Sequence, residues 1–209
     1  MEVISEIRRE RGKVRLMIEG CEDIVIPLSL FRARPMAEGE AIDLEEYEHW
    51  LLLHQYRPAL EKAVSLLAAR AHSRREIEQK LLRTGYRPGT VEMVLYKLEK
   101  ERLLDDADFA RQWVETRSSR KMGRERIARE LRQKGVDEEE AAAALEEIDA
   151  EEQLAAAAAL VEKAAARIKP GEDPRRAAQR ITGMLIRRGY SWDVAREALS
   201  QAMQNLEEI

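Results

Sequence analysis

Three aspartates stand within four residues near the middle of the chain, in the stretch LLDDADFARQW that runs from Leu103 to Trp113. Asp105, Asp106 and Asp108 are carboxylates, the ligands that hard divalent cations such as Mg²⁺ prefer. A metal-dependent enzyme would also need further ligands and a catalytic partner converging from elsewhere. The three histidines show no metal-ligand spacing, and no second carboxylate motif answers the first.

The same aspartates fit the start of a helix. A side-chain oxygen at the N-cap accepts a hydrogen bond from an unpaired backbone N–H, and further acids in the first turn favour the positive end of the helix dipole. Phe109 and Trp113 follow four residues apart, as on a buried helix face. We therefore predict a structural cluster, with Asp106 as the cap, and no metal. Phosphate-cradling glycine loops, nucleophile elbows, HExxH and CxxC motifs are missing, so the sequence predicts neither an enzyme nor a cofactor.

Composition indicates a mostly helical protein. Of the 209 residues 36% are charged and 5% aromatic, and Ala, Glu, Leu, Arg and Lys dominate the chain after residue 57. The single cysteine, Cys21, excludes an internal disulfide, and we interpret it as a small buried residue of a strand. The N-terminus is charged, without a signal-peptide core, and no apolar run could span a bilayer. These features predict a soluble, cytoplasmic protein that has no membrane contact.

The first forty residues differ from the rest. The segments VISEI, KVRLMI and DIVIP are short and rich in Val and Ile, with Gly12 and Gly20 near the turns between them. This pattern predicts a small antiparallel β element, followed by irregular chain or a short helix around LSLFRA. From Asp43, a good N-cap, the chain turns helical, and Pro58 is expected to break or restart that helix.

Three glycines mark an internal repeat in the remaining chain. Gly85, Gly135 and Gly189 stand 50 and 54 residues apart, and each has isoleucine eight and leucine four residues before it. Residues four apart share a helix face, and a glycine past the last turn accepts the left-handed cap conformation. Positions six, nine, ten and thirteen after each glycine trace the buried stripe of a following helix. Each unit also has a helix before the one that ends at its glycine, at Leu60 to Ala71, Asp108 to Arg117 and Leu154 to Arg167.

These observations predict an all-α fold, namely an elongated, curved tandem array of three three-helix, helix-turn-helix-like repeats, with the small antiparallel β element at the N-terminus. We expect the chain to be a monomer. The predicted domains are the β element at 1–42, the first three-helix unit with its long lead-in helix at 43–104, the second unit at 105–150 and the third unit at 151–209.

Charge alternates along the second unit. Residues 117–134 carry eight basic and two acidic side chains, whereas residues 135–152 carry nine acidic and no basic ones. Weaker basic groups recur in the other units, so we predict a cationic track suited to a phosphate backbone or an acidic protein groove. The simpler alternative is a solvated face with i,i+4 ion pairs. Aromatic residues do not interleave the basic stretch, which argues against base stacking, and Trp113 is expected in the core. The predicted partner-binding or DNA-binding residues are Arg74, Arg75, Arg83, Arg117, Arg120, Lys121, Arg124, Arg126, Arg129, Arg132 and Lys134.

The stretch LEKERLLDDADFARQWVETRSSRKMGRERIARELRQKGV resembles the RecX family, regulators of the RecA recombinase. The shared pattern joins Asp-Asp-x-x-Phe-Ala, a basic loop containing glycine, and Ile-x-x-Glu-Leu-x-x-Lys-Gly. SRREIEQKLLRTGY and LIRRGYSWDVAREAL also look like family segments, so the resemblance covers about residues 57–205 and leaves the first 56 outside. It implies a non-enzymatic modulator that binds the RecA filament on DNA and lowers its recombinase and co-protease activities. The net charge of −4 fits only weak, electrostatic binding to single- or double-stranded DNA.

Two other functions stay open on the sequence. A tandem helix-turn-helix protein that binds nucleic acid would need exposed Arg, Asn or Gln at base-reading positions of each third helix. The segments PGTVEMVLYKLEK and DEEEAAAALEEI are instead neutral or acidic on their expected outer faces. A structural scaffold without a regulated partner is the remaining alternative.

Overall fold

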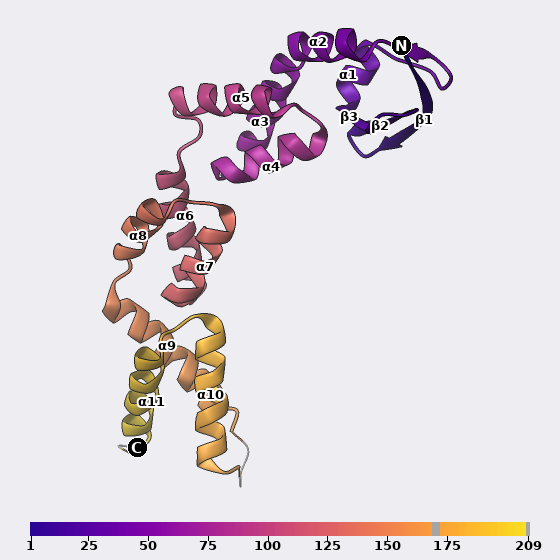
Figure 1. Cartoon of the computed structure of the whole chain (residues 1–209). Coiled ribbons are helices and arrows are strands. Elements are labelled where there is room, and N and C mark those ends of the chain that lie inside the picture. Colours follow the sequence, from indigo (N-terminus) through magenta and orange to yellow (C-terminus); the bar gives the residue numbers. More distant parts are fainter. Residues whose placement is uncertain (169–171, 208–209) are drawn as a thin grey trace. The chain divides into compact units, whose positions relative to one another are not determined.

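A computed structural model describes residues 1–168 and 172–207 of the chain (Figure 1). Within these residues it contains eleven α-helices and four β-strands, which confirms the helical fold with an antiparallel β element at its N-terminus. The chain divides into two compact units, Met1–Asp105 and Asp106–Ile209, and each is described by itself. None of the helices in the described ranges is long and apolar enough to cross a membrane.

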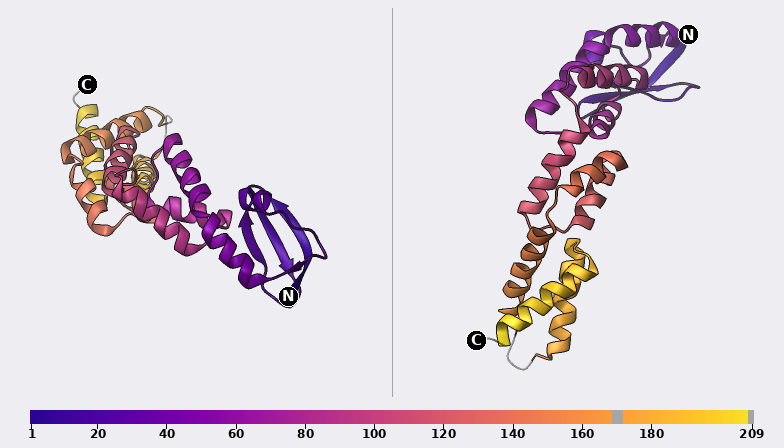
Figure 2. Two further views of the ribbon diagram at one scale, coloured as in Figure 1. Left: turned by 90° about the horizontal axis from the view of Figure 1, so that it is seen from above. Right: turned by 90° about the vertical axis from the view of Figure 1, so that its left-hand side faces the viewer.

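The N-terminal element is a four-stranded antiparallel sheet with strand order β3-β2-β1-β4. The sheet lies at the N-terminal end of the chain (Figure 2, left). Its second strand alternates as KVRLMI predicts, with Val14, Leu16 and Ile18 buried on one face. The sequence did not predict the last strand, because two residues are too few to show a period. The elements are β1 (Glu2–Glu10), β2 (Lys13–Ile18), β3 (Ile24–Pro27), the short helix α1 (Leu28–Ala33) at LSLFRA, and β4 (Ala41–Ile42).

The sheet has a hydrophobic core of its own. Ile4, Leu16 and Ile26 are fully buried, and Phe31 of α1 and Tyr47 of α2 (Leu44–His54) pack with them. Burial of side chains of this size stabilises a fold by about 1.5–3 kcal/mol each. The first helix of the lead-in segment therefore completes the interior of the N-terminal sheet.

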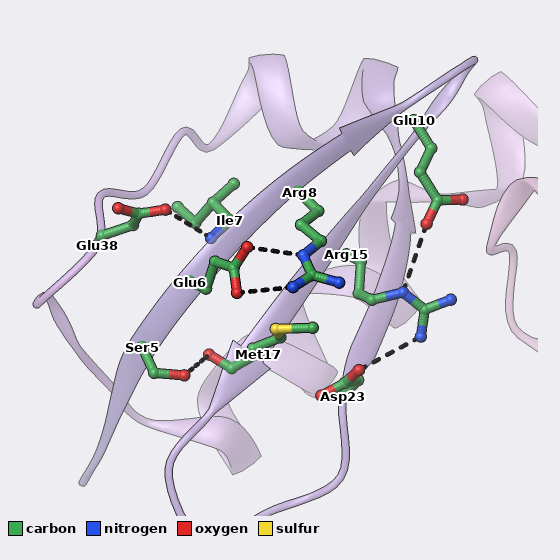
Figure 3. A network of polar contacts seen from close by, with 9 residues as sticks. All are labelled: Ser5, Glu6, Ile7, Arg8, Glu10, Arg15, Met17, Asp23 and Glu38. Carbon is green, nitrogen blue, oxygen red and sulfur yellow. Dashed lines mark hydrogen bonds and ion pairs between the residues drawn. The ribbon is translucent and has the colours of Figure 1, made fainter.

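Polar side chains on the β1–β2 hairpin pair with one another (Figure 3). Arg8 Nε lies 2.6 Å from Glu6 Oε1, and Arg15 bridges Glu10 and Asp23 at 3.4 Å each. Exposed ion pairs of this kind contribute at most about 1 kcal/mol to stability. They also decide the charge of this surface. Because acidic side chains pair with both arginines, the hairpin presents no basic patch at these positions.

Cys21 is exposed, so its interpretation as a buried strand residue is wrong. Strand β2 ends at Ile18, and Gly20 then takes a left-handed conformation with φ +76°. The resulting turn is closed by the Cys21 N–H, which donates to the Ile18 carbonyl at 3.2 Å. The sequence GCE thus forms the turn itself and does not start the next strand.

The predicted break in the lead-in helix occurs at Gln55, between α2 and α3 (Tyr56–Ala69). Asp43 caps α2 as predicted, because its side chain accepts a hydrogen bond from Glu46 N at 3.0 Å. Pro58 lacks an N–H and its ring would clash with the carbonyl of His54, which is where α2 ends. The first repeat helix therefore begins at Tyr56, four residues before the predicted start.

The first three-helix unit consists of α3, α4 (Arg74–Thr84) and α5 (Pro88–Lys100). Gly85 ends α4 with φ +100°, and its N–H and that of Tyr86 bond back to the carbonyls of Leu82 and Leu81. Tyr86 is buried against the helix end, a contact that often accompanies such a glycine. Gly85 also approaches the sheet closely, since a Cβ there would lie 2.9 Å from the Val25 carbonyl oxygen.

The second and third units follow the same scheme. Gly135 and Gly189 end their helices with φ +78° and +91°, and Val136 and Tyr190 after them are buried. All four predicted stripe positions of the first unit are buried, and the equivalent residues of the other units are buried or partly buried, many of them alanine. The helices are α6 (Asp106–Ser119), α7 (Arg124–Lys134), α8 (Glu138–Glu146), α9 (Ala150–Ala165), α10 (Pro174–Arg188) and α11 (Trp192–Glu207).

The aspartate cluster lies at the start of a helix, as predicted, but Asp106 is not the cap. Helix α6 begins with Asp106, so Asp106 and Asp108 both stand in its first turn. Asp108 accepts hydrogen bonds from Arg111 at 3.2 Å and Gln112 at 2.7 Å. Across the ranges that the structure describes, no group of three or more His, Cys, Asp or Glu side chains is arranged to hold a metal ion.

His72 makes the stability of the first three-helix unit depend on pH. Its side chain is buried directly before α4, with Nδ1 2.9 Å from the Arg70 carbonyl oxygen. Burial lowers the pKa of the His72 imidazole below its ordinary value of 6.5. The unfolded chain therefore binds a proton more readily than the folded chain as the pH falls below 6.5, and unfolding becomes easier.

We predict that the free energy of unfolding declines between about pH 7 and pH 5 more steeply in the natural protein than in a His72→Gln variant. Glutamine keeps a hydrogen-bond donor for the Arg70 carbonyl but does not titrate. Urea denaturation at several pH values measures this difference. Parallel pH curves for the two proteins would show that His72 does not titrate differently in the folded state.

Candidate partner and nucleic-acid interface

Five cations of the predicted set lie exposed on the α6–α7 loop and on α7. In the described part of the chain their side chains form no ion pair, although Arg129 Nε donates to the Glu125 carbonyl at 3.3 Å. Positive side chains that lack acidic neighbours are available to an external anion. We call these residues the basic surface: Arg120, Lys121, Arg124, Arg129 and Arg132.

The other three cations of this stretch pack against the second unit itself. Arg117 is only 17% exposed, and its Nε lies 2.6 Å from Glu130 Oε2. Its guanidinium stands 4.0 Å from the centre of the Trp113 ring, and Lys134 Nζ lies 4.1 Å from the same centre. Arg126 Nε contacts Glu130 at 3.1 Å. These cations pack around Trp113 and Glu130, and Trp113 lies against the core as the sequence predicts. Because they are engaged within the unit, they are less available to a partner than the basic surface.

Glu130 organises this inward-facing group. Burial of its carboxyl favours the neutral form, but hydrogen bonds from Arg126 and Arg117 outweigh burial and hold the pKa of Glu130 below its ordinary value of 4.5. The carboxylate also accepts a hydrogen bond from Trp113 Nε1 at 3.2 Å. A charged Glu130 thus neutralises two arginines and leaves the basic surface as the exposed positive region of this unit.

Lys121 occupies a backbone conformation that usually belongs to glycine. Its φ is +55°, and its N–H donates to the Ser118 carbonyl while that of Met122 donates to the Arg117 carbonyl. Gly85 and Tyr86 end α4 with the same pair of hydrogen bonds. The left-handed conformation costs a residue with a Cβ on the order of 1 kcal/mol. A lysine at this position gives up stability and adds an exposed cation to the loop.

Arg74, at the equivalent place of the first unit, is not exposed in the same way. Its guanidinium pairs with Glu92 and Glu99 of α5, both at 2.7 Å. Fifty residues on, Arg124 holds the position of Arg74 and Ala142 that of Glu92, while Asp149, at the position of Glu99, accepts hydrogen bonds from the first N–H groups of α9. Of the other predicted cations in the first unit, Arg75 and Arg83 are exposed. A continuous track across the units stays a prediction.

Two glycines bring the third unit directly against the start of α7. A Cβ on Gly123 would overlap the Gly189 carbonyl group, and a Cβ on Gly189 would overlap the backbone of Arg126. Gly123 N donates to Arg188 O, and Glu125 N donates to Gly189 O, both at 3.0 Å. Gly123 therefore permits contact between two backbones 66 residues apart in sequence, a role that the loop sequence alone does not reveal.

The third unit also supplies the cap of α7. In the first unit Ser73 caps α4 with its own side chain, in a capping box with Glu76. Gly123 has no side chain for this, and the first N–H groups of α7 are instead satisfied by Gly189 and by Gln153, whose Oε1 accepts from Arg124 N at 3.3 Å. The carboxyl end of α10 thus faces the amino end of α7, an arrangement that the helix dipoles favour.

This junction also brings a cation of the third unit beside the basic surface. Arg188 Nη1 lies 3.5 Å from the Arg120 carbonyl oxygen and 3.4 Å from that of Lys121. Trp192 follows Gly189 by three residues and is 63% exposed. Arg188 thus lies beside the α6–α7 loop, and the exposed indole of Trp192 follows it closely in sequence.

The fold and this surface define the class of protein: tandem three-helix units with an exposed basic loop and a separately cored N-terminal sheet. Family models match the three units in order, as the first three-helix domain of RecX over residues 59–98, the second over 105–145 and the third over 151–199. The chain belongs to the RecX family.

Curated relatives agree with this assignment, and solved structures share the fold. The regulatory protein RecX of Mycobacterium avium is 39% identical over 64% of this chain and 78% of its own length. That of Mycolicibacterium vanbaalenii is 40% identical over 67% and 79%. A RecX crystal structure from Lactobacillus salivarius has a TM-score of 0.66 at 23% identity, covering 71% of this chain and 97% of its own. Another RecX crystal structure has a TM-score of 0.64 at 24% identity, covering 94% and 98%.

We predict that Gly123→Ala lowers the free energy of unfolding by about 2 kcal/mol or more, because the added methyl must push two backbones apart. Gly183→Ala is the matched control: Gly183 lies inside α10, where a Cβ would meet only Arg187 Nη1 at 3.3 Å. There alanine should raise stability by up to about 1 kcal/mol. Denaturant unfolding of both variants measures the contrast. Equal effects of the two substitutions would contradict a tight Gly123–Gly189 contact.

Proposed function

We propose that this protein binds the RecA recombinase filament on DNA and inhibits its recombinase and co-protease activities. The proposal rests first on family membership, because the curated relatives are named regulatory protein RecX. It also rests on the tandem helical units, in which the apolar positions of the repeat form the cores and exposed charged side chains are left for a partner. Its partners are the RecA filament and, through weak electrostatic contacts, its single- or double-stranded DNA.

The observation that carries the proposal is that some cations form ion pairs within their own unit and others do not. Arg74, Arg117 and Arg126 are paired with acids of their own unit, whereas the basic surface has no such partners among the described residues. Lys121 is kept there in spite of its unfavourable backbone conformation. A cationic loop of this kind can face phosphates or the acidic side chains of a filament groove. It would bind as the monomer that the sequence predicts.

A helix-turn-helix protein that reads bases directly fits the exposed residues less well. On α5 the exposed positions include Glu92, Met93 and Tyr96, and on α8 they include Glu138 and Glu139. None of these offers the Arg, Asn or Gln contacts that distinguish base edges in the major groove. The third helices of the first two units therefore support packing and give no support to sequence-specific recognition.

We predict that reversing Arg120, Lys121 and Arg124 to glutamate weakens binding to a recombinase filament on single-stranded DNA by at least about tenfold, with a shallower salt dependence. Inhibition of strand exchange and of co-protease cleavage should fall in parallel. Folding should survive, because the three side chains are exposed and acidic residues are favoured at the start of α7. Circular dichroism and fluorescence anisotropy at several salt concentrations measure both properties.

The matched control reverses three exposed cations outside the basic surface, namely Arg11, Lys62 and Lys100, and changes the net charge by the same amount. Its filament affinity should stay within about threefold of the natural protein. If both triple variants lost affinity equally, net charge would explain the effect and the loop would not be the site. A basic-surface variant with full affinity and full inhibition would refute the proposal directly.

A further inference from the structure

The corner between α10 and α11 forms an open groove of about 480 Å³. Thr182, Gly183 and Ile186 of α10 line it together with Arg187, the last but one residue of that helix. Trp192, the first residue of α11, lines the groove as well. An aromatic ring and a guanidinium thus border one concave surface.

Trp192 differs from the other two tryptophans. Trp50 stacks on Tyr47 and His54, and Trp113 lies between Arg117 and Lys134. Trp192 is 63% exposed and, among the described residues, makes no aromatic or cation contact. An exposed indole forfeits much of the stabilisation that burial of such a large apolar surface gives, so its use is to be sought in a ligand.

Gly183 is a second unusual feature of the groove. It lies in the interior of α10, where glycine is about 1 kcal/mol less favourable than alanine. Packing does not demand it, because a Cβ there would meet only the mobile end of Arg187. Because glycine has no side chain, a flat group in the groove can approach the backbone of α10 closely at this position.

Cations continue from the groove toward the α6–α7 loop. Arg187 is exposed, and Arg188 reaches the carbonyl oxygens of Arg120 and Lys121. The acid nearest in sequence to Trp192, Asp193, is drawn toward Arg196 at 3.4 Å. A polyanion lying on the basic surface can therefore extend into the groove without meeting an unpaired carboxylate of that segment.

We propose that this groove binds an unpaired base of single-stranded nucleic acid, with the base stacked on Trp192 and a flanking phosphate held by Arg187. A flat π-face beside a cation is what a nucleotide base next to its phosphate requires. Bases in a duplex are stacked on each other and cannot reach an indole, so the occupant is single-stranded. The proposed function supplies the source of the strand, the DNA in the recombinase filament, but the binding belongs to this chain.

The test uses the full chain without any recombinase and two probes: a short oligothymidylate and an abasic oligonucleotide of the same length and charge. The thymine probe should quench tryptophan fluorescence and bind at least about fivefold more tightly than the abasic probe, as expected for one stacked base. In Trp192→Leu this preference should vanish, with both probes bound as weakly as the abasic one. Trp192→Tyr, which keeps a ring, should restore much of the preference.

Arg187→Gln separates the phosphate contact from stacking. It should weaken both probes alike and reduce the slope of log affinity against log salt by about 0.7, the value for one single-strand phosphate. Because Trp192 and Arg187 are exposed, neither substitution disturbs a core, and circular dichroism checks this. An equal affinity of the natural protein for both probes, or an unchanged preference in Trp192→Leu, would overturn the proposal.

One outcome points to a protein partner in place of a base. If Trp192→Leu weakened binding to the filament while the natural protein showed no preference between the two probes, Trp192 would contact the recombinase and the groove would not be a base site. The proposed function fails by a different result, namely retention of filament binding by the basic-surface variant. The two claims can therefore be refuted separately.

Discussion

The close backbone contact between Gly123 and Gly189 joins the second three-helix unit to the third. Neither residue can carry a side chain there, because a Cβ on either would overlap the other unit's backbone. The contact lets the carboxyl end of α10 satisfy the amino end of α7, which has no side-chain cap of its own. It also sets Arg188 beside the α6–α7 loop. Without it, the basic loop and the corner that holds Trp192 would be separate features of two small helical units.

The cations around this junction fall into two groups, those that form contacts within the second unit and those that are exposed without an ion pair among the described residues. Arg117, Arg126 and Lys134 cover Trp113 or neutralise Glu130, and so stabilise the second unit from within. The side chains of the basic surface form no ion pair among the described residues, and alanine replaces one of the two acids that pair with Arg74 in the first unit. A family of regulators built on repeated helical units can acquire a binding surface in this way, by changing the acids around one repeat while its core stays the same.

The repeats could be predicted from the sequence because local rules specify them. A left-handed glycine, a leucine four residues before it and an apolar stripe after it give the same helix pair in all three units. The role of Gly123 could not be predicted, because it depends on a contact with Gly189, 66 residues away in sequence. The exposure of Trp192 could not be predicted either, because it depends on how α10 and α11 meet at their corner. Cys21 was misplaced for a local reason, since its turn and a strand start have similar composition. The paired state of Arg74 and Arg117 likewise depends on acids from other helices.

Amide hydrogen exchange of the second unit tests this account most directly. Gly123 N–H and Glu125 N–H stand at the start of α7, where a helix offers them no partner of its own, and both donate to the end of α10. The account predicts that both amides exchange at least about a hundredfold more slowly than in an unstructured peptide, as expected for hydrogen bonds that open only when the units part. Unprotected exchange at both positions, with Leu131 inside α7 still protected, would show that the two units do not hold this contact in solution.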